Sequence, residues 1–133
     1  LNTPHNPTGW VASDDELRGL AEIAVAADLL VISDEVYEHL VFDGRAHRPL
    51  AANPGMFERT VTVSSAAKMF NVTGWKIGWA LGPAELITGV RAALGDGLLD
   101  LPPHLLEQRG PVRGIHAQQQ GSGLGLCHLF YDR

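Results

Sequence analysis

Four short segments of the sequence carry side chains that could do chemistry together. They supply an amide, a carboxylate with a nearby phenol, and two amines, from Asn6, Asp34, Tyr37, Lys68 and Lys76. Taken singly, these residues have plain structural explanations. Asparagine before proline forms turns, aspartate after a strand caps helices, tyrosine packs with its hydroxyl in water, and lysines are mostly solvated. It is their combination along one chain that indicates a site.

The lysines are few and close together. The chain has eight arginines but only two lysines, Lys68 and Lys76, which are eight positions apart. Lysines that served only solubility would be expected to scatter along the chain, as the arginines do. Lys68 also follows directly after four small residues, Ser64 to Ala67. This distribution favours a chemical role over a solvated surface.

Two helices are predicted next to these segments. Ser13 and Glu16 match a capping box, and the apolar residues that follow keep helical spacing, which predicts a helix over residues 14–27. Pro83 can occupy the first turn of a second helix. The apolar face of that helix consists of Leu86, Ile87, Val90 and Leu94. The first helix therefore separates Asn6 from Asp34, and the second follows Lys76.

Three β-prone runs predict strands at residues 29–32, 60–63 and 77–81. The first has no polar alternation, as expected for a strand that is covered on both faces. Helices that alternate with buried strands imply an α/β layer architecture. Ligands of open α/β sheets bind outside the carboxyl ends of the strands. Asp34 and Lys68 both follow such ends, so we expect them at this edge of the sheet.

The composition limits the class of protein. The 133 residues suffice for about one domain, and 45% of them are hydrophobic, enough for a packed core. The net charge of −5 argues against a nucleic-acid or membrane partner, and no apolar run approaches the ~20 residues that cross a bilayer. The single cysteine, Cys127, permits no internal disulfide and fits a cytoplasmic setting. The six histidines show no paired ligand spacing, so no metal site is expected.

The segments together resemble the class I/II aminotransferases, which depend on pyridoxal 5′-phosphate (PLP). This family carries Asn-Pro-Thr-Gly or Asn-Pro-Leu-Gly, then Asp-x-x-Tyr at a strand end, then Ser-x-x-Lys, then a basic residue eight positions on. Here Asp34 follows Asn6 by 28 residues, and Lys68 follows Asp34 by 34. Residues 32–44 and 73–79 look most like the branch that holds kynurenine and N-succinyldiaminopimelate aminotransferases. The resemblance implies part of the fold type I PLP-binding large domain over residues 1–93, a partial three-layer α/β sandwich around a mostly parallel sheet.

The resemblance also implies roles in catalysis. Lys68 would form the imine with the cofactor aldehyde and then move the substrate proton, which requires an amine that can lose its own proton. Asp34 would pair with the pyridine nitrogen and keep it protonated. Asn6 and Tyr37 would hydrogen-bond the phenolic oxygen of the ring. Lys68, Asp34 and Tyr37 are therefore the expected catalytic residues.

The phosphate of the cofactor would be held by Ser65, three positions before Lys68, and by Lys76. The family often has arginine at the latter position, and lysine offers a point charge instead of a bidentate fork. The implied reaction moves an amino group between an amino acid and a 2-oxo acid, in a parent protein expected to be a homodimer.

The pattern and the family likeness end at about Ala93. Residues 94–133 hold seven of the fifteen glycines and three consecutive glutamines, and no helix or strand pattern persists there. We expect an irregular tail that is disordered or out of frame. No arginine there matches the one that grips the substrate carboxylate in the family. Because the chain begins at Leu1 within a motif, we expect a fragment with weak or no activity of its own.

Three alternatives stay open. Some members of this family cleave carbon–sulfur bonds as β-lyases. An aminotransferase-like domain also serves as the PLP-sensing part of certain transcription regulators. The third alternative is that the isolated fragment is catalytically inert.

Overall fold

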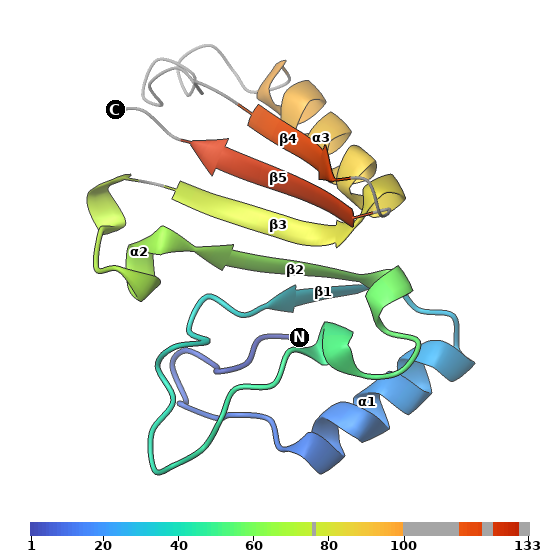
Figure 1. Ribbon diagram of the computed structural model, residues 1–133, viewed down its shortest axis with the longest axis vertical. Coiled ribbons are helices and arrows are strands. Elements are labelled where there is room, and N and C mark those ends of the chain that lie inside the picture. The colour runs from blue at the N-terminus through green and yellow to red at the C-terminus, as the bar shows by residue number, and fades with distance from the viewer. Residues whose placement is uncertain (76, 100–114, 121–123, 131–133) are drawn as a thin grey trace.

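The computed structural model describes residues 1–75, 77–99, 115–120 and 124–130 (Figure 1). Helix α1 spans Asp14–Ala26, one residue short of the predicted end. Ser13 caps it as expected, because its hydroxyl accepts from the Glu16 backbone amide while the Glu16 carboxylate accepts from the Ser13 backbone amide. The buried face of this helix is Leu17, Ala21 and Ala24.

Five strands form one sheet in the order β1-β2-β3-β5-β4. Their bounds are β1 Val31–Asp34, β2 Thr60–Ser65, β3 Ile77–Pro83, β4 Ile115–Gln120 and β5 Leu124–Phe130. Strands β1 and β2 are parallel, and each of the other neighbouring pairs is antiparallel. The short helices are η1 Leu50–Ala52, η2 Phe57–Arg59, α2 Ala66–Met69 and η3 Thr73–Trp75. The last helix, α3, spans Ala84–Leu99. It begins one residue after Pro83, which was expected in its first turn and instead ends β3.

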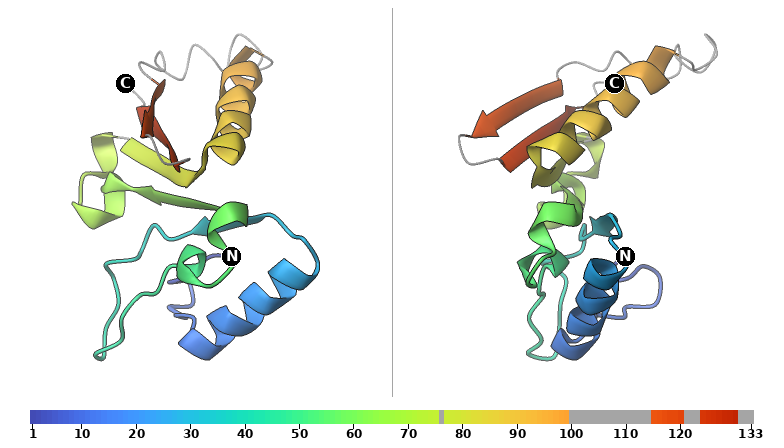
Figure 2. Two further views of the ribbon diagram at one scale, coloured as in Figure 1. Left: turned by 45° about the vertical axis from the view of Figure 1, so that its right-hand side comes forward. Right: turned by 90° about the vertical axis from the view of Figure 1, so that its right-hand side faces the viewer.

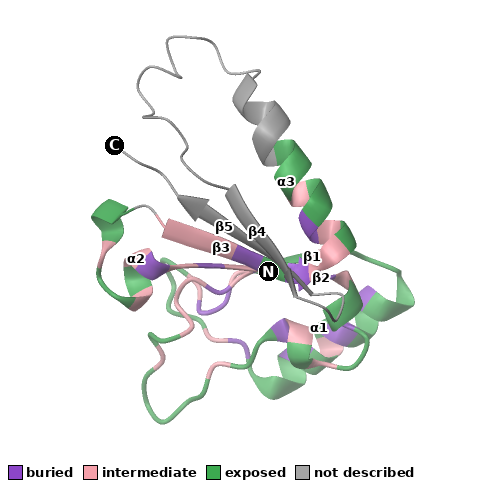
Figure 3. Ribbon diagram, turned by 45° about the horizontal axis from the view of Figure 1, so that its top comes forward, coloured by how far each residue is buried: buried purple, intermediate pink, exposed green. Residues whose placement is uncertain are grey.

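Two hydrophobic cores lie on opposite faces of the sheet. Alternate residues of a strand face opposite sides, and residues paired in register face the same side. Val31 packs on the α1 core and pairs with Thr60, whereas the next residue of β2, Val61, packs with Ala80 of β3 and Ile87 of α3. Helices α1 and α3 therefore cover different faces, and the partial three-layer sandwich is confirmed (Figures 2 and 3).

Strand β1 differs from the prediction in where it starts and in how far its side chains are buried. It starts at residue 31 instead of 29, because Asp28 adopts φ 50° and the Leu29 amide bonds back to the Ala24 carbonyl at 2.8 Å, which ends α1. Leu30 and Ile32 are 70% and 66% exposed. The expectation that this strand is covered on both faces was therefore wrong, since the α3 core does not extend over it.

Two further expectations about the sheet were wrong. It is not mostly parallel, because the connection from β2 to β3 is short and returns the chain in the opposite direction. The tail is not irregular throughout, since residues 115–120 and 124–130 pair with each other and continue the sheet from β3. Helix α3 also runs past residue 93 to Leu99. Strand pairing in this tail depends on the neighbouring strand β3, and the glycine- and glutamine-rich sequence carries no alternation that would reveal it.

No helix among the described residues has both the length and the apolar character needed to cross a membrane.

Candidate active site

The predicted site residues that the structure describes gather where β1 and β2 end. The two strands are parallel, with Asp34 paired to Val63, so their carboxyl ends share one edge. Asp34 closes β1, and Lys68 lies in α2, which starts directly after Ser65 at the end of β2. The predicted placement of Asp34 and Lys68 at this edge is confirmed.

The Asp34 carboxylate is half-buried and oriented from two sides. Its Oδ1 accepts from the Val36 backbone amide at 3.2 Å, and its Oδ2 accepts from Asn2 Nδ2 at 3.4 Å. The first bond closes a turn of the kind that aspartate favours after a strand. The backbone of Asp34 is fixed as well, because it accepts from the Thr3 amide at 3.1 Å and donates to the Leu1 carbonyl at 2.9 Å.

Asn2 is a contact that the sequence did not reveal. It lies beside Asp34 because residues 1–3 run parallel to β1 and form an isolated bridge at this point. The two residues are 32 positions apart, and no motif links them. Only the pairing of the first residues with β1 brings Asn2 to the site.

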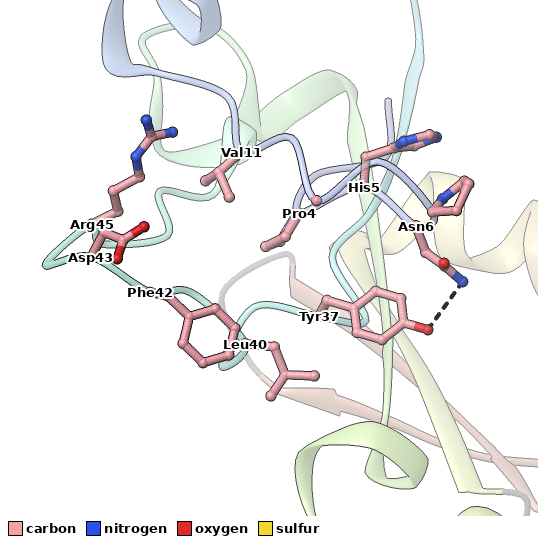
Figure 4. Close-up of a pocket in the computed structure, with 11 residues that line it drawn as sticks. Pro4, His5, Asn6, Val11, Tyr37, Leu40, Phe42, Asp43 and Arg45 are labelled. Carbon is pink, nitrogen blue, oxygen red and sulfur yellow. Dashed lines mark hydrogen bonds between the residues drawn. The ribbon is translucent and has the colours of Figure 1, made fainter.

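Asn6 and Tyr37 meet in space, 31 positions apart in sequence. Asn6 Nδ2 donates to the Tyr37 hydroxyl at 3.3 Å (Figure 4). Asn6 is presented by a tight turn, in which the Gly9 amide donates to the His5 carbonyl at 2.8 Å. Gly9 has φ 71°, a conformation that glycine adopts without strain. An amide and a phenol are thus held side by side at the surface.

Lys68 faces the ring of Tyr37. Its Nζ lies 5.9 Å from the ring centroid, within the range of a cation–π contact. The side chain is exposed, and its amine makes no hydrogen bond or ion pair with any described residue. Ser65, also assigned to the site, is half-buried and makes no side-chain capping bond to α2. Lys76 lies outside the described residues.

A cavity of about 470 Å³ adjoins the Asn6–Tyr37 pair. Its lining mixes apolar side chains with polar ones, and the charged side chains of Asp43 and Arg45 lie at the end away from Asn6 (Figure 4). Asp34 and Lys68 do not line it. The predicted site residues that the structure describes therefore share one edge of the sheet, but they do not all line one cavity.

A second polar cluster lies on the opposite face of β1 from the Asp34 side chain. Glu35 is buried, and its Oε2 lies 2.8 Å from His47 Nε2. Glu38 lies nearby and accepts from the Ser64 hydroxyl at 3.1 Å. Sequence reasoning did not single out these residues, because 12 positions of loop separate Glu35 from His47 and their spacing matches no ligand motif.

Comparison with known proteins identifies the family. The model of the aminotransferase class I and II family matches residues 1–106. A probable N-succinyldiaminopimelate aminotransferase of Mycobacterium tuberculosis is 73% identical over 93 residues, which are 70% of this chain and 23% of that protein. Mouse kynurenine–oxoglutarate transaminase 3 is 58% identical over 87 residues, 65% of this chain and 19% of that protein.

Solved structures agree. The structure of N-succinyldiaminopimelate aminotransferase from M. tuberculosis matches with a TM-score of 0.69 at 73% identity, over 70% of this chain and 24% of that one. An aspartate aminotransferase of Thermus thermophilus matches with a TM-score of 0.61 at 45% identity, over 66% of this chain and 22% of that one. The chain spans about a fifth to a quarter of the length of these relatives. With the family model matched over residues 1–106, the chain belongs to the class I and II aminotransferases.

Proposed function

We propose that this chain supplies the cofactor-binding core of a PLP-dependent aminotransferase, which moves an amino group between an amino acid and a 2-oxo acid. The observation that carries the proposal is the meeting of Asp34, Asn6 with Tyr37, and Lys68 at one edge of the sheet. These groups come from segments about 30 positions apart. The packing of the fold does not require a carboxylate, a phenol and an amine to lie together at this edge.

The described residues fit this cofactor. The Asp34 carboxylate receives only two protein donors, at 3.2 and 3.4 Å, so lone pairs remain for a further N–H donor. The Lys68 amine is accessible and has no described hydrogen-bond partner to give up. The Tyr37 hydroxyl accepts from Asn6 and can still donate its own proton. The three groups thus offer an acceptor, a nucleophile and a donor.

Each residue then has a physical task. PLP, when bound, supplies an electron-withdrawing ring that stabilises negative charge on the substrate carbon. Asp34 presents negative charge at a fixed position, which favours a protonated ring nitrogen. Lys68 would hold the cofactor through its amine, and the amine, when free, would carry a proton to and from the substrate. Asn6 and Tyr37 donate to the phenolic oxygen and set the orientation of the ring.

The cofactor phosphate, the substrate and the partner subunit would be bound by further groups. Ser65 and Lys76 hold the phosphate through a hydroxyl and a charge. The 73% identity to a protein named as an N-succinyldiaminopimelate aminotransferase favours a donor of that type. An enzyme that contains this chain acts as a homodimer in a cytoplasmic setting.

Covalent trapping tests the proposal. PLP is added to the purified chain, borohydride is used to reduce any imine formed with an amine, and peptide mapping by mass spectrometry locates the adduct. We expect it on Lys68 and not on Lys76 or the amino group of Leu1. Lys68→Arg, which keeps the charge but cannot react in this way, and Lys68→Ala should both lose the adduct. Unchanged trapping in both variants contradicts the proposal.

A further inference from the structure

Glu35 lies next to Asp34 in sequence but points to the other face of β1. Its side chain is 1% exposed, and that of His47 is 8% exposed. Burying a carboxylate is costly unless hydrogen bonds compensate for the lost water. Here Oε1 accepts from the Ser33 hydroxyl at 2.8 Å and from the Leu50 amide at 3.4 Å, and Oε2 bonds to His47 Nε2 at 2.8 Å. Both oxygens of Glu35 are therefore satisfied by the protein.

These bonds close the long connection between β1 and β2. Residue 47 lies near the end of the loop that leaves the turn of Tyr37, and Leu50 opens η1. Through Glu35, both are tied to the carboxyl end of β1. The Glu35 amide also donates to the Val63 carbonyl at 2.9 Å, which fixes this residue to β2. Glu35 is thus a junction of the strand, the loop and the neighbouring strand.

The turn that carries Tyr37 is held from this junction. The Glu38 amide donates to the Glu35 carbonyl at 2.9 Å, and the Glu38 carboxylate accepts from Ser64 at 3.1 Å. At its start, the turn is held by the Val36 amide on Asp34. Tyr37 therefore lies between Val36, which is bonded to Asp34, and Glu38, which is bonded to Ser64 of β2.

We propose that Glu35 and His47 are positioning residues for the cofactor site: their buried pair fixes the turn that aims Tyr37 and orients the Asp34 carboxylate. This inference rests on the function proposed above. Glu35 and His47 contact neither the amine nor the amide of the site and act only through Asp34 and Tyr37. The ligand atoms of Glu35, Glu38 and His47 lie within 4.8 Å of one another. A shared cation is not favoured, because the atoms that would bind it already take part in the hydrogen bonds described.

The test measures PLP binding by the full chain and the pH midpoint of the absorbance change of the bound cofactor. We expect Glu35→Ala to weaken affinity about tenfold, the effect of losing one well-formed hydrogen bond to the cofactor. The pH midpoint of the absorbance change in Glu35→Ala should differ from that of wild type by at least half as much as the midpoint in Tyr37→Phe does. Glu35→Gln should remain close to wild type, because its amide can accept from Ser33 and donate to a neutral His47.

A matched control separates positioning from general loss of stability. Leu17, fully buried in the α1 core, is shortened to valine or alanine to match the loss of unfolding free energy in Glu35→Ala. This control should keep the wild-type affinity in its folded fraction and the wild-type pH midpoint. If Glu35→Ala does not fold, His47→Ala provides the same test, since Glu35 keeps the Ser33 and Leu50 donors.

A double-mutant cycle gives the decisive comparison. If Glu35 acts through Tyr37, then Tyr37→Phe should weaken binding less in the Glu35→Ala background than in wild type. Independent effects of the two substitutions would overturn the inference, as would a Glu35→Ala protein with wild-type affinity and pH midpoint. Either result leaves the proposed function standing if the wild-type chain binds PLP. A wild-type chain that does not bind PLP overturns both proposals.

Discussion

The two strands that meet at the site present their side chains in different ways. On the β1 side, Asp34 is bonded to Val36 and Asn2, and Tyr37 is bonded to Asn6. On the β2 side, the amine of Lys68 is exposed and has the Tyr37 ring at 5.9 Å as its described contact. The β1 side is assembled by the protein itself, whereas the β2 side is open to a ligand.

This difference suits the proposed chemistry. A charge that must stay in one place acts best when its orientation is fixed in advance, so that no reorganisation is needed during reaction. A lysine that binds, leaves and carries protons must instead change its position, and long side chains held in one rotamer lose entropy. The held β1 side and the open β2 side therefore correspond to different tasks.

Removing the charge from the β1 side should have the largest effect. Asp34→Asn keeps an oxygen for the Val36 amide, so the turn should persist, but it loses the negative charge opposite the cofactor. We expect PLP affinity to fall on the order of 100-fold, as for loss of a charged partner at a half-buried site. Fluorescence titration measures the change. Glu22→Gln, an exposed change of the same charge on α1, should bind as wild type, and equal losses in both would contradict the role of Asp34.

Breaking the Asn6–Tyr37 pair tests whether the β1 side acts as a unit. Tyr37→Phe removes one donor to the cofactor and should weaken binding about tenfold. Asn6→Ala should weaken it by less, and the double variant should be less impaired than independent effects predict, because the two side chains share a hydrogen bond. Titrating all three variants gives the coupling. Strictly additive effects would mean that the pair does not cooperate in binding.

On the β2 side, the contribution of Ser65 to binding affinity should depend on the phosphate of the ligand. Ser65→Ala removes one hydroxyl and should weaken PLP binding about fivefold. It should leave the binding of pyridoxal, which lacks the phosphate, unchanged. Comparing the two ligands in wild type and variant isolates the phosphate contact. An equal loss for both ligands would place Ser65 elsewhere in the site.

A substitution away from both sides should affect stability alone. Ser13→Ala removes the α1 cap and should cost about 1 kcal/mol of unfolding free energy in urea, with unchanged PLP affinity. The pKa of the Glu16 carboxyl lies below its ordinary value of 4.5, because the Ser13 amide and hydroxyl donate to the ionised form. A lowered pKa stabilises the fold above the unfolded value, so the difference between wild type and variant should shrink as the pH falls below 4.5. A difference that grew on acidification would contradict this cap.

The local elements could be predicted from sequence because their causes are local. The Ser13–Glu16 capping box predicts where α1 begins, and Pro83 predicts the start of α3. Asp34 and Lys68 were expected at one edge because each follows a β-prone run, and the carboxyl ends of parallel strands lie at the same edge of a sheet. These features depend on a few neighbouring residues or on one topological rule.

The remaining features depend on contacts that the sequence does not display. Strand β1 begins two residues later than predicted, because Asp28 and Leu29 take part in ending the helix before it. Asn2 and the Glu35–His47 pair reach their partners only through the folding of residues 1–3 and of the β1–β2 connection. Strand β5 pairs with β3, and β4 pairs with β5, although neither segment has an alternating pattern that would predict a strand.

A crystal structure of the chain with PLP added would show whether Lys68 and Asp34 hold the cofactor as proposed. We expect continuous density between Lys68 Nζ and the cofactor, with an Asp34 oxygen within about 3.2 Å of the ring nitrogen. We also expect that the Asn6–Tyr37 pair and the turn at Asp34 change little on binding, while the Lys68 side chain takes a new, ordered position. A cofactor bound away from Lys68, or a β1 side that rearranges to reach it, would contradict the proposed roles of Lys68 and Asp34.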